Sequence, residues 1–278
     1  MKLFRFFKLK YSYIINISFI IFLISGNVYS QKNIHKWKFE DTPEWFDDFE
    51  NSDQLDSAKW TYETGGDGWG NNELQYYTKG DNALIENGIL KIISKKESKR
   101  KRKYTSSRIV TKNKGEWLYG KIEVKAKLPC GRGTWPAFWM LPVRQYYGKE
   151  TSSGEIDIME HVGYEPDIVH FSIHNKAYNS SLKNEKTTKL TVKKSSSAFH
   201  IYRLDWTPYG IRGFVDGKKY FEYKNTGKGS KYWPFDKKFF LIINLAIGGD
   251  WGGIKGIDNS IFPATLEIDY VRVFNFIE

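Results

Sequence analysis

The chain has 278 residues, with 43 Lys and Arg against 32 Asp and Glu, one cysteine, and 10 Trp, 18 Tyr and 19 Phe. So many aromatic side chains exclude a mainly disordered protein, because they must be buried away from water, and the length suits one large all-β domain. Cys130 has no partner in the chain, which excludes an intrachain disulfide and leaves stability to a packed core.

The first thirty residues, 1–30, are typical of a secretory signal peptide. Four basic residues lie between positions 2 and 10, and residues 14–24 are almost wholly apolar, a run that is short for a membrane span. Small or compact residues precede a predicted cut between Ser30 and Gln31. We therefore expect a secreted protein, extracellular or periplasmic, without a stable membrane anchor; cleavage leaves 39 basic against 32 acidic residues, or +7. An uncleaved N-terminal anchor is the alternative.

Short strands dominate the rest of the predicted pattern. Residues 31–44 are polar and are expected to form a short lead-in, and from Trp45 onward apolar or alternating runs are separated by turn pairs such as Asn87-Gly88. Without a long amphipathic helix, repeat or dividing linker, the pattern predicts one all-β domain over residues 45–278, a two-sheet sandwich or a barrel. The predicted strands are 89–93, 119–127, 168–173, 199–206, 211–215, 239–245 and 266–274.

Two segments are strongly basic. Residues 95–103 hold seven Lys or Arg, and residues 183–194 hold five Lys. Such runs are usually solvated loops or strand ends, and the alternative is a surface that binds an anionic polymer. No aromatic residue interrupts the first run, which argues against a nucleic-acid module.

Potentially catalytic side chains are most closely spaced in residues 154–161, where Glu155, Asp157 and Glu160 are interleaved with apolar residues. β-Branched isoleucines favour a strand, on which Glu155 and Asp157 share one face. Regular alternation would place Glu160 on the opposite face, and a β-bulge near Met159 would return it to the acidic one.

Such an arrangement suits glycoside hydrolysis. With the bulge, the Glu155 and Glu160 Cα atoms would be roughly 13 Å apart. Inclined side chains could then bring the carboxyl groups to about 5–5.5 Å, the separation of a retaining glycosidase. Three such close carboxylates should raise at least one pKa, so that an acid coexists with an ionised nucleophile. The alternatives are a solvated acidic strand edge and a metal site built from carboxylates.

The segment 154–161 resembles the catalytic signature of glycoside hydrolase family 16 in its bulged E-x-D-x-x-E form. Further motifs match the family in order, and the resemblance covers residues from about 45 to 275. It is similar to the bacterial laminarinase branch, the endo-acting β-1,3-glucanases. The matching segments are 69–78, 131–142, 174–179, 199–208 and 244–253.

This resemblance implies a β-jelly-roll sandwich of two antiparallel sheets with a concave substrate cleft. It implies that Glu155 is the nucleophile, Glu160 the general acid and then base, and Asp157 a helper beside Glu155. It also implies no cofactor or metal in the catalysis.

The matching motifs supply candidate sugar-binding residues. Trp135, Trp139 and Trp251 could stack under glucosyl rings, with the indole N–H left over for a hydroxyl, or they could belong to the core. Asn71 and Glu73 could hydrogen-bond sugar hydroxyls, Asn71 being the better candidate. The remaining candidates, each with a structural alternative, are Arg108 as a cleft cation and His174 as a sugar ligand or a group that orients Glu160. His161, by contrast, is expected to be structural.

A structural calcium ion is a further implication, held on the convex side by Glu50, the Gly88 backbone and Asp269, whose oxygens suit calcium. Asp269 could instead merely cap a strand. The thiol of Cys130 is expected to be free and without a catalytic role.

Three functions compete at this point. The first is a secreted, retaining endo-β-1,3-glucanase that could also cut mixed β-1,3/1,4-glucan, working as a monomer on a polysaccharide and not on nucleic acid. The second is a relative acting on an algal galactan, such as an agarase or carrageenase, which the positive charge would suit if the chain were sulfated. The third, a non-catalytic carbohydrate-binding sandwich, should lack one catalytic Glu, whereas both are present.

Overall fold

The computed structural model describes residues 37–50 and 53–277, and the folded unit occupies this part of the chain. The predicted signal peptide, residues 1–30, lies outside the described residues. Within them, no helix is both long and apolar enough to cross a membrane.

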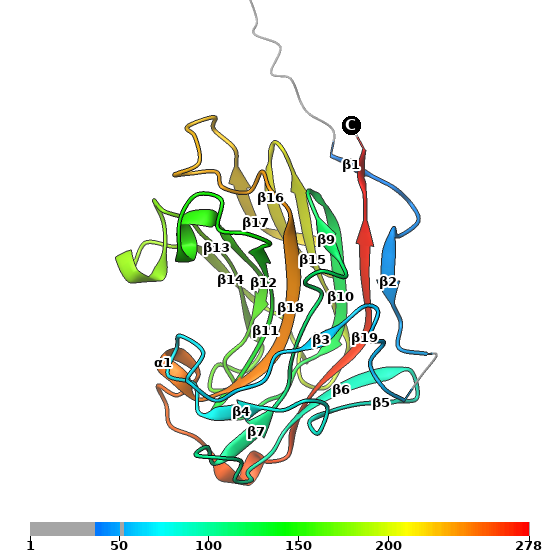
Figure 1. Cartoon of the computed structure of the whole chain (residues 1–278), viewed down its shortest axis with the longest axis vertical. Helices are drawn as coiled ribbons and strands as arrows, with labels where there is room; N and C mark the ends of the chain where they lie inside the picture. Colours follow the sequence, from blue (N-terminus) through cyan, green and yellow to red (C-terminus); the bar gives the residue numbers. More distant parts are fainter. Residues whose placement is uncertain (1–36, 51–52, 278) are drawn as a thin grey trace, which may run out of the picture. The chain divides into compact units, whose positions relative to one another are not determined.

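Two antiparallel sheets form the layers of the folded unit (Figure 1). The first, which we call the outer sheet, has the order β17 (Lys218–Lys224), β16 (Gly210–Val215), β15 (His200–Thr207), β10 (Gly120–Lys127), β19 (Ala264–Phe274), β6 (Ile89–Ser94) and β5 (Ala83–Glu86), with β2 (Trp45–Asp47) beside β19. The second, the cleft sheet, has the order β14 (Lys186–Thr191), β13 (Ile168–His174), β12 (Glu155–Glu160), β11 (Thr134–Pro142), β18 (Phe239–Ile247), β8 (Arg108–Val110) and β3 (Thr61–Tyr62), with β9 (Glu116–Trp117) beside β18.

Short elements complete the described chain. β1 (Lys38–Phe39) pairs with β20 (Phe276–Ile277), and β4 (Gln75–Tyr77) pairs in parallel with β7 (Tyr104–Ser106). The helical pieces are α1 (Gly249–Gly252) and the 3₁₀ turns Glu150–Ser153, Ser180–Leu182 and Asn259–Ile261. The all-β prediction is confirmed, and each of the seven predicted strands is present with ends shifted by a few residues at most.

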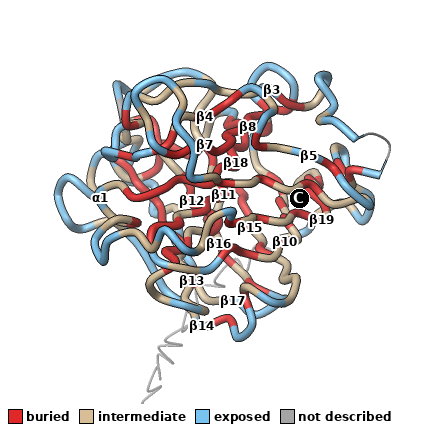
Figure 2. Tube along the Cα trace, turned by 90° about the horizontal axis from the view of Figure 1, so that it is seen from below, coloured by how far each residue is buried: buried red, intermediate tan, exposed pale blue. Residues whose placement is uncertain are grey.

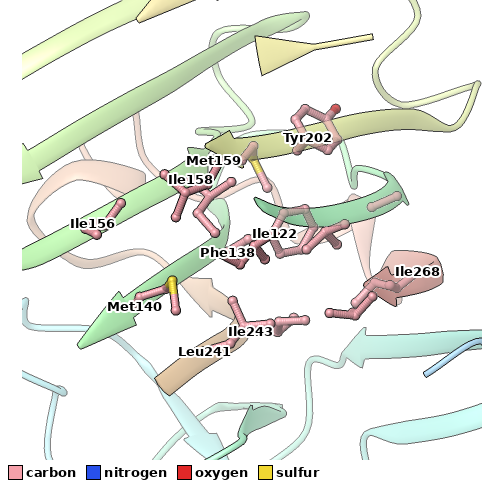
Figure 3. Close-up of a cluster of buried hydrophobic side chains, with 14 of the residues drawn as sticks. Ile122, Phe138, Met140, Ile156, Ile158, Met159, Tyr202, Leu241, Ile243 and Ile268 are labelled. Atoms are coloured by element: carbon pink, nitrogen blue, oxygen red, sulfur yellow. The ribbon is translucent and has the colours of Figure 1, made fainter. Parts of the chain in front are cut away.

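The core lies between the two sheets, because alternate side chains of their strands point inward. β10 alternates buried and half-buried residues along its whole length, whereas all nine residues of β18 are buried. In Figure 2 the buried stretches run through the middle of the folded unit and the connecting loops are exposed. Figure 3 shows Ile156, Ile158 and Met159 of β12 within this cluster, beside Ile122 and Ile268 of the outer sheet. Burial of this apolar surface is the main source of stability.

The folded unit begins earlier than the predicted boundary at Trp45. Lys38 pairs with Ile277 and Phe39 with Phe276, whose ring lies 6.0 Å from that of Phe39. The last residues of the expected lead-in therefore join the chain end as a strand, since backbone pairing needs no apolar pattern in the sequence.

Several of the other tryptophans are packing residues. Trp45 contacts Trp60 and Trp117 edge to face at 5.5 and 5.4 Å, and Trp206 is fully buried. Cys130 is exposed and has a free thiol.

Candidate active site

A β-bulge on β12 gathers the three acidic side chains. Against β11, Phe138 is opposite Met159 but Trp139 is opposite Asp157, which leaves Ile158 as the extra residue. Ile158 and Met159 are both completely buried in the core, so Glu160 returns to the face that carries Glu155 and Asp157. The predicted bulge is confirmed. It arises because two consecutive apolar side chains both pack into the core.

A cleft of about 670 Å³ lies over this face of the cleft sheet. Its floor comes from β11, β12, β13 and β18, and its ends from the 70–73 loop, α1 and the loop before β14. Acidic side chains line it, and none of the described residues in its lining is a Lys or Arg, although the chain has a net charge of +11. The acidic residues are Glu73, Glu155, Asp157, Glu160, Glu185 and Asp250.

Burial favours the protonated forms of Glu155, Asp157 and Glu160, which we call the acidic triplet. Burial, together with the adjacent Asp157 charge, raises the pKa of Glu155 from 4.5 to about 8. Asp157 is only 3 % exposed, and burial likewise raises its pKa and that of Glu160. A hydrogen bond joins the carboxyl groups of Glu155 and Asp157. The triplet as a whole therefore retains at least one proton near neutral pH, which an acid catalyst requires.

Two histidines of β13 lie opposite the two glutamates. His174 is paired with Glu155, and its Nε2 lies 3.1 Å from Asp157 Oδ2. The cross-strand neighbour of Glu160 is His170, because the bulge shortens the stretch of β13 that faces this strand. His174 contacts Asp157, and its charge also acts on Glu160, so an orienting role of His174 stays a prediction.

Trp135 and Trp251 form an aromatic corner beside Glu160. Their rings meet edge to face at 5.6 Å, and Trp251 also contacts the His170 ring at 4.9 Å. Trp135 donates its indole N–H to Glu160 Oε1 at 3.2 Å. The expectation that this N–H is free for a sugar hydroxyl is therefore wrong for Trp135 in the substrate-free protein. The donated hydrogen bond holds the carboxyl of Glu160 in place.

Trp139 likewise uses its indole N–H internally. It donates to Asn244 Oδ1 at 2.7 Å, and the Asn244 amide donates to the Tyr77 hydroxyl at 3.1 Å. The Tyr77 hydroxyl donates to Glu73 Oε2 at 3.1 Å, and the Gln75 amide donates to the same oxygen at 2.6 Å. Glu73 is thus a buried anchor rather than a free sugar ligand. Burial also raises its pKa.

Residues 70–272 match the family described as Glycosyl hydrolases family 16. The chain belongs to this family.

Its relatives include the beta-glucanase of Rhodothermus marinus, 48 % identical over 243 residues that make up 84 % of this chain and 85 % of the relative. The glucan endo-1,3-beta-glucosidase of Cryptopygus antarcticus is 36 % identical over 250 residues, 82 % of this chain and 90 % of the relative. The solved structure of the laminarinase from Rhodothermus marinus matches with a TM-score of 0.84 at 46 % identity, over 88 % of this chain and 100 % of that one.

As a member of this family, the protein is a glycosidase with a jelly-roll fold, and the mechanism of the family is retaining. Membership does not by itself assign a role to each side chain of this protein. The structure brings Asn71, Trp135, Trp139, His174 and Trp251 to the same cleft as the acidic triplet.

Arg108 lies beside this cleft rather than in its lining. Its Nε donates to Glu63 Oε2 at 2.6 Å, and its guanidinium lies 4.8 Å from the Trp69 ring and 4.9 Å from the Trp139 ring. The side chain is only 10 % exposed. These contacts show that Arg108 supports the aromatic ring of Trp139, although the sequence suggested a charge directed toward substrate.

The sequence assigned no role to Tyr77, Asn244 or His170. Tyr77 and Asn244 had a signal, because they lie in the matching segments 69–78 and 244–253, and Asn244 is the only polar residue in the apolar run 239–247. His170 lies outside the matching segments and had no such signal.

The calcium ligands expected from the family are only partly together. Glu50 lies beside Gly88, with its Cγ 3.5 Å from the position of a β-carbon there. The Asp269 carboxylate, however, forms an ion pair with Lys125 Nζ at 2.6 Å. Asp269 as arranged does not fit a calcium ligand, because a lysine ammonium holds its charge. The calcium site stays a prediction and no role is derived from it.

Proposed function

We propose that this protein is an endo-acting, retaining β-1,3-glucanase that also accepts mixed β-1,3/1,4-glucan. The observation that carries the proposal is the bulge of β12, which places Glu155, Asp157 and Glu160 on the floor of one cleft. The names of the relatives support the substrate, since they include a beta-glucanase and a glucan endo-1,3-beta-glucosidase.

The geometry supports a double displacement. Glu155 attacks the anomeric carbon to form a glycosyl ester, while Glu160 gives its proton to the departing oxygen. Glu160 then removes a proton from water, which hydrolyses the ester with overall retention. The Trp135 N–H keeps Glu160 in position, and Asp157 shares a proton with Glu155. The raised pKa of Glu160 supports its role as the acid at neutral pH.

Charge favours a neutral polysaccharide over a sulfated galactan. Among the described residues, the cleft is lined by six acidic side chains and by no Lys or Arg, so the side chains that are ionised would repel sulfate groups. The positive charge of the molecule lies elsewhere and gives a sulfated chain no anchor inside the cleft. Both catalytic candidates are present in the cleft, which also argues against a purely sugar-binding role.

We further propose that the signal segment is cleaved near Ser30 and that the mature protein acts outside the cell as a monomer. The support is the sequence pattern of residues 1–30. Mass spectrometry of the exported protein and its elution volume in size-exclusion chromatography test both statements. An intact N-terminus on the exported protein would contradict the cleavage.

The decisive experiment is a panel of laminarin, lichenan, agarose and carrageenan, with product sizes and anomeric configuration followed by chromatography and NMR. We expect oligosaccharides from laminarin that first appear with the β configuration. Products from agarose or carrageenan, with none from laminarin, would replace the glucanase by the galactanase.

A further inference from the structure

Three side chains on the cleft floor bring one potential metal-binding atom each into a compact group. The donor atoms of Glu155, Asp157 and His174 all lie within 4.8 Å of one another. The group is built on regular strand geometry, because Glu155 and His174 are direct cross-strand partners and Asp157 is two residues along the same face.

The Asp157 and His174 atoms are spaced as metal ligands are. Asp157 Oδ2 and His174 Nε2 are 3.1 Å apart. Tetrahedral zinc holds such oxygen and nitrogen ligands at about 2.0–2.2 Å, which places neighbouring ligands roughly 3.3 Å from each other. A zinc ion therefore fits between these two atoms with little movement of either strand.

A second observation points to a missing partner at this place. Asp157 is 3 % exposed, and its Oδ2, which lies 3.1 Å from His174 Nε2, has no hydrogen-bond partner among the described residues. Buried carboxylate oxygens are rarely left without a donor or a cation. The surrounding carboxylates of the cleft, which include Glu160 and Glu185, would also concentrate cations here.

We propose that Glu155, Asp157 and His174 form a reversible inhibitory site for a divalent transition-metal ion such as Zn²⁺. A histidine nitrogen with two carboxylates suits zinc, whereas calcium takes six to eight oxygens. The ion would bind the Glu155 carboxylate, which attacks the sugar, so bound metal and bound substrate would exclude each other. This inhibition rests on the proposed role of Glu155, while the binding of the metal does not.

Isothermal titration of the purified, chelator-treated protein with Zn²⁺ tests the site directly. We expect one saturable site in the wild type, weakened at least about tenfold in His174→Asn. Asp157→Asn provides a second test with the same expectation should the first variant fail to fold. His200→Asn is the matched control, because His200 Nδ1 also lies 2.7 Å from a carboxylate, that of Asp216, but no third ligand joins them in the described part of the chain.

Undiminished binding in both His174→Asn and Asp157→Asn, or loss of the site in His200→Asn, would overturn the proposal. So would the absence of saturable binding in the wild type.

Kinetics with laminarin distinguish the binding of the metal from the catalytic role of Glu155. Competitive inhibition by Zn²⁺, seen as a rise in KM without a fall in kcat, supports the metal site and the role of Glu155 together. Binding at this site without inhibition would leave the metal site standing and refute the role of Glu155. Inhibition without calorimetric binding at these residues would overturn the metal site alone.

Discussion

Glu160 differs from the other two acids in its immediate neighbours. Trp135 donates a hydrogen bond to it, and its cross-strand partner is His170, whereas Glu155 and Asp157 hydrogen-bond to each other beside His174. Two carboxyl groups on one strand thus have separate environments, which is the usual basis for separate acid and nucleophile roles.

Replacement of Glu160 by Gln removes the proton donor without a change of size. We expect kcat on laminarin to fall about 10²–10⁴-fold. A glucoside with an activated aryl leaving group should lose much less in its first, aglycone-releasing step, because that group departs without protonation. Rapid-quench measurement of this step checks the result, with Glu222→Gln on the outer sheet as control. Equal losses on both substrates would contradict the role of acid.

The raised pKa of Glu155 has a consequence for stability. Its pKa in the folded protein is about 8 against an ordinary 4.5, so the folded state favours the protonated form. The stabilising contribution is fully present below pH 4.5 and is lost as the pH rises toward about 8. Glu155→Gln lacks this titration. We expect the Tm of the wild type to fall relative to that of Glu155→Gln across this range, measured by calorimetry. A constant difference in Tm would contradict the burial of the carboxyl.

At the scale of elements, the cleft sheet is joined to the segment 73–77 by a chain of buried hydrogen bonds. The chain runs from Glu73 through Tyr77 and Asn244 to the indole of Trp139. Arg108 supports Trp139 from β8, which is separated from the strand of Trp139 by β18. An aromatic surface in the cleft is therefore oriented by polar groups beneath it rather than by apolar packing alone.

Tyr77→Phe interrupts this chain at its centre: it removes the acceptor of the Asn244 amide and one of the two hydrogen bonds to Glu73 Oε2. We expect a loss of about 1–3 kcal/mol in the free energy of unfolding and a rise in KM for laminarin larger than the fall in kcat. Urea unfolding and steady-state kinetics check both effects.

Tyr202→Phe is the matched control, since the Tyr202 hydroxyl is also fully buried but has no hydrogen-bond partner. We expect this variant to keep or gain stability and to retain its KM. Equal effects of the two substitutions would show that the chain does not position Trp139.

At the scale of the whole folded unit, the spacing of the two sheets depends on close contacts in the core. Gly213 of β16 lies across from Phe171 of β13, whose ring stacks on Phe221 at 4.5 Å. A β-carbon at Gly213 would be 2.3 Å from the Phe171 ring. The sheets therefore approach each other here as closely as a glycine permits.

Gly213→Ala should force this ring and the two sheets apart. We expect a loss of about 1–3 kcal/mol in the free energy of unfolding, measured with urea, because overpacking displaces neighbours from their rotamers. Thr191→Ala, at the exposed end of the edge strand β14, is the control and should change little. An unchanged stability of Gly213→Ala would show that the sheets can slide at this point.

The amino-acid sequence by itself determined the strands, the sandwich and the acidic face of β12. These features depend on neighbours in the chain: alternation selects the buried face, and two consecutive core residues, Ile158 and Met159, produce the bulge. The family motifs also located most of the residues that line the cleft.

Only the tertiary structure decided what each side chain contacts. Trp139 with Asn244, Arg108 with Glu63, and Asp157 with His174 are pairs from separate segments of the chain, and no local pattern encodes their meeting. The protonation of the acidic triplet likewise follows from burial, which the strands produce only after they have packed. The sequence therefore specified which chemical groups are present. The packing of distant segments determined which groups contact each other, which of them are protonated and where a ligand can bind.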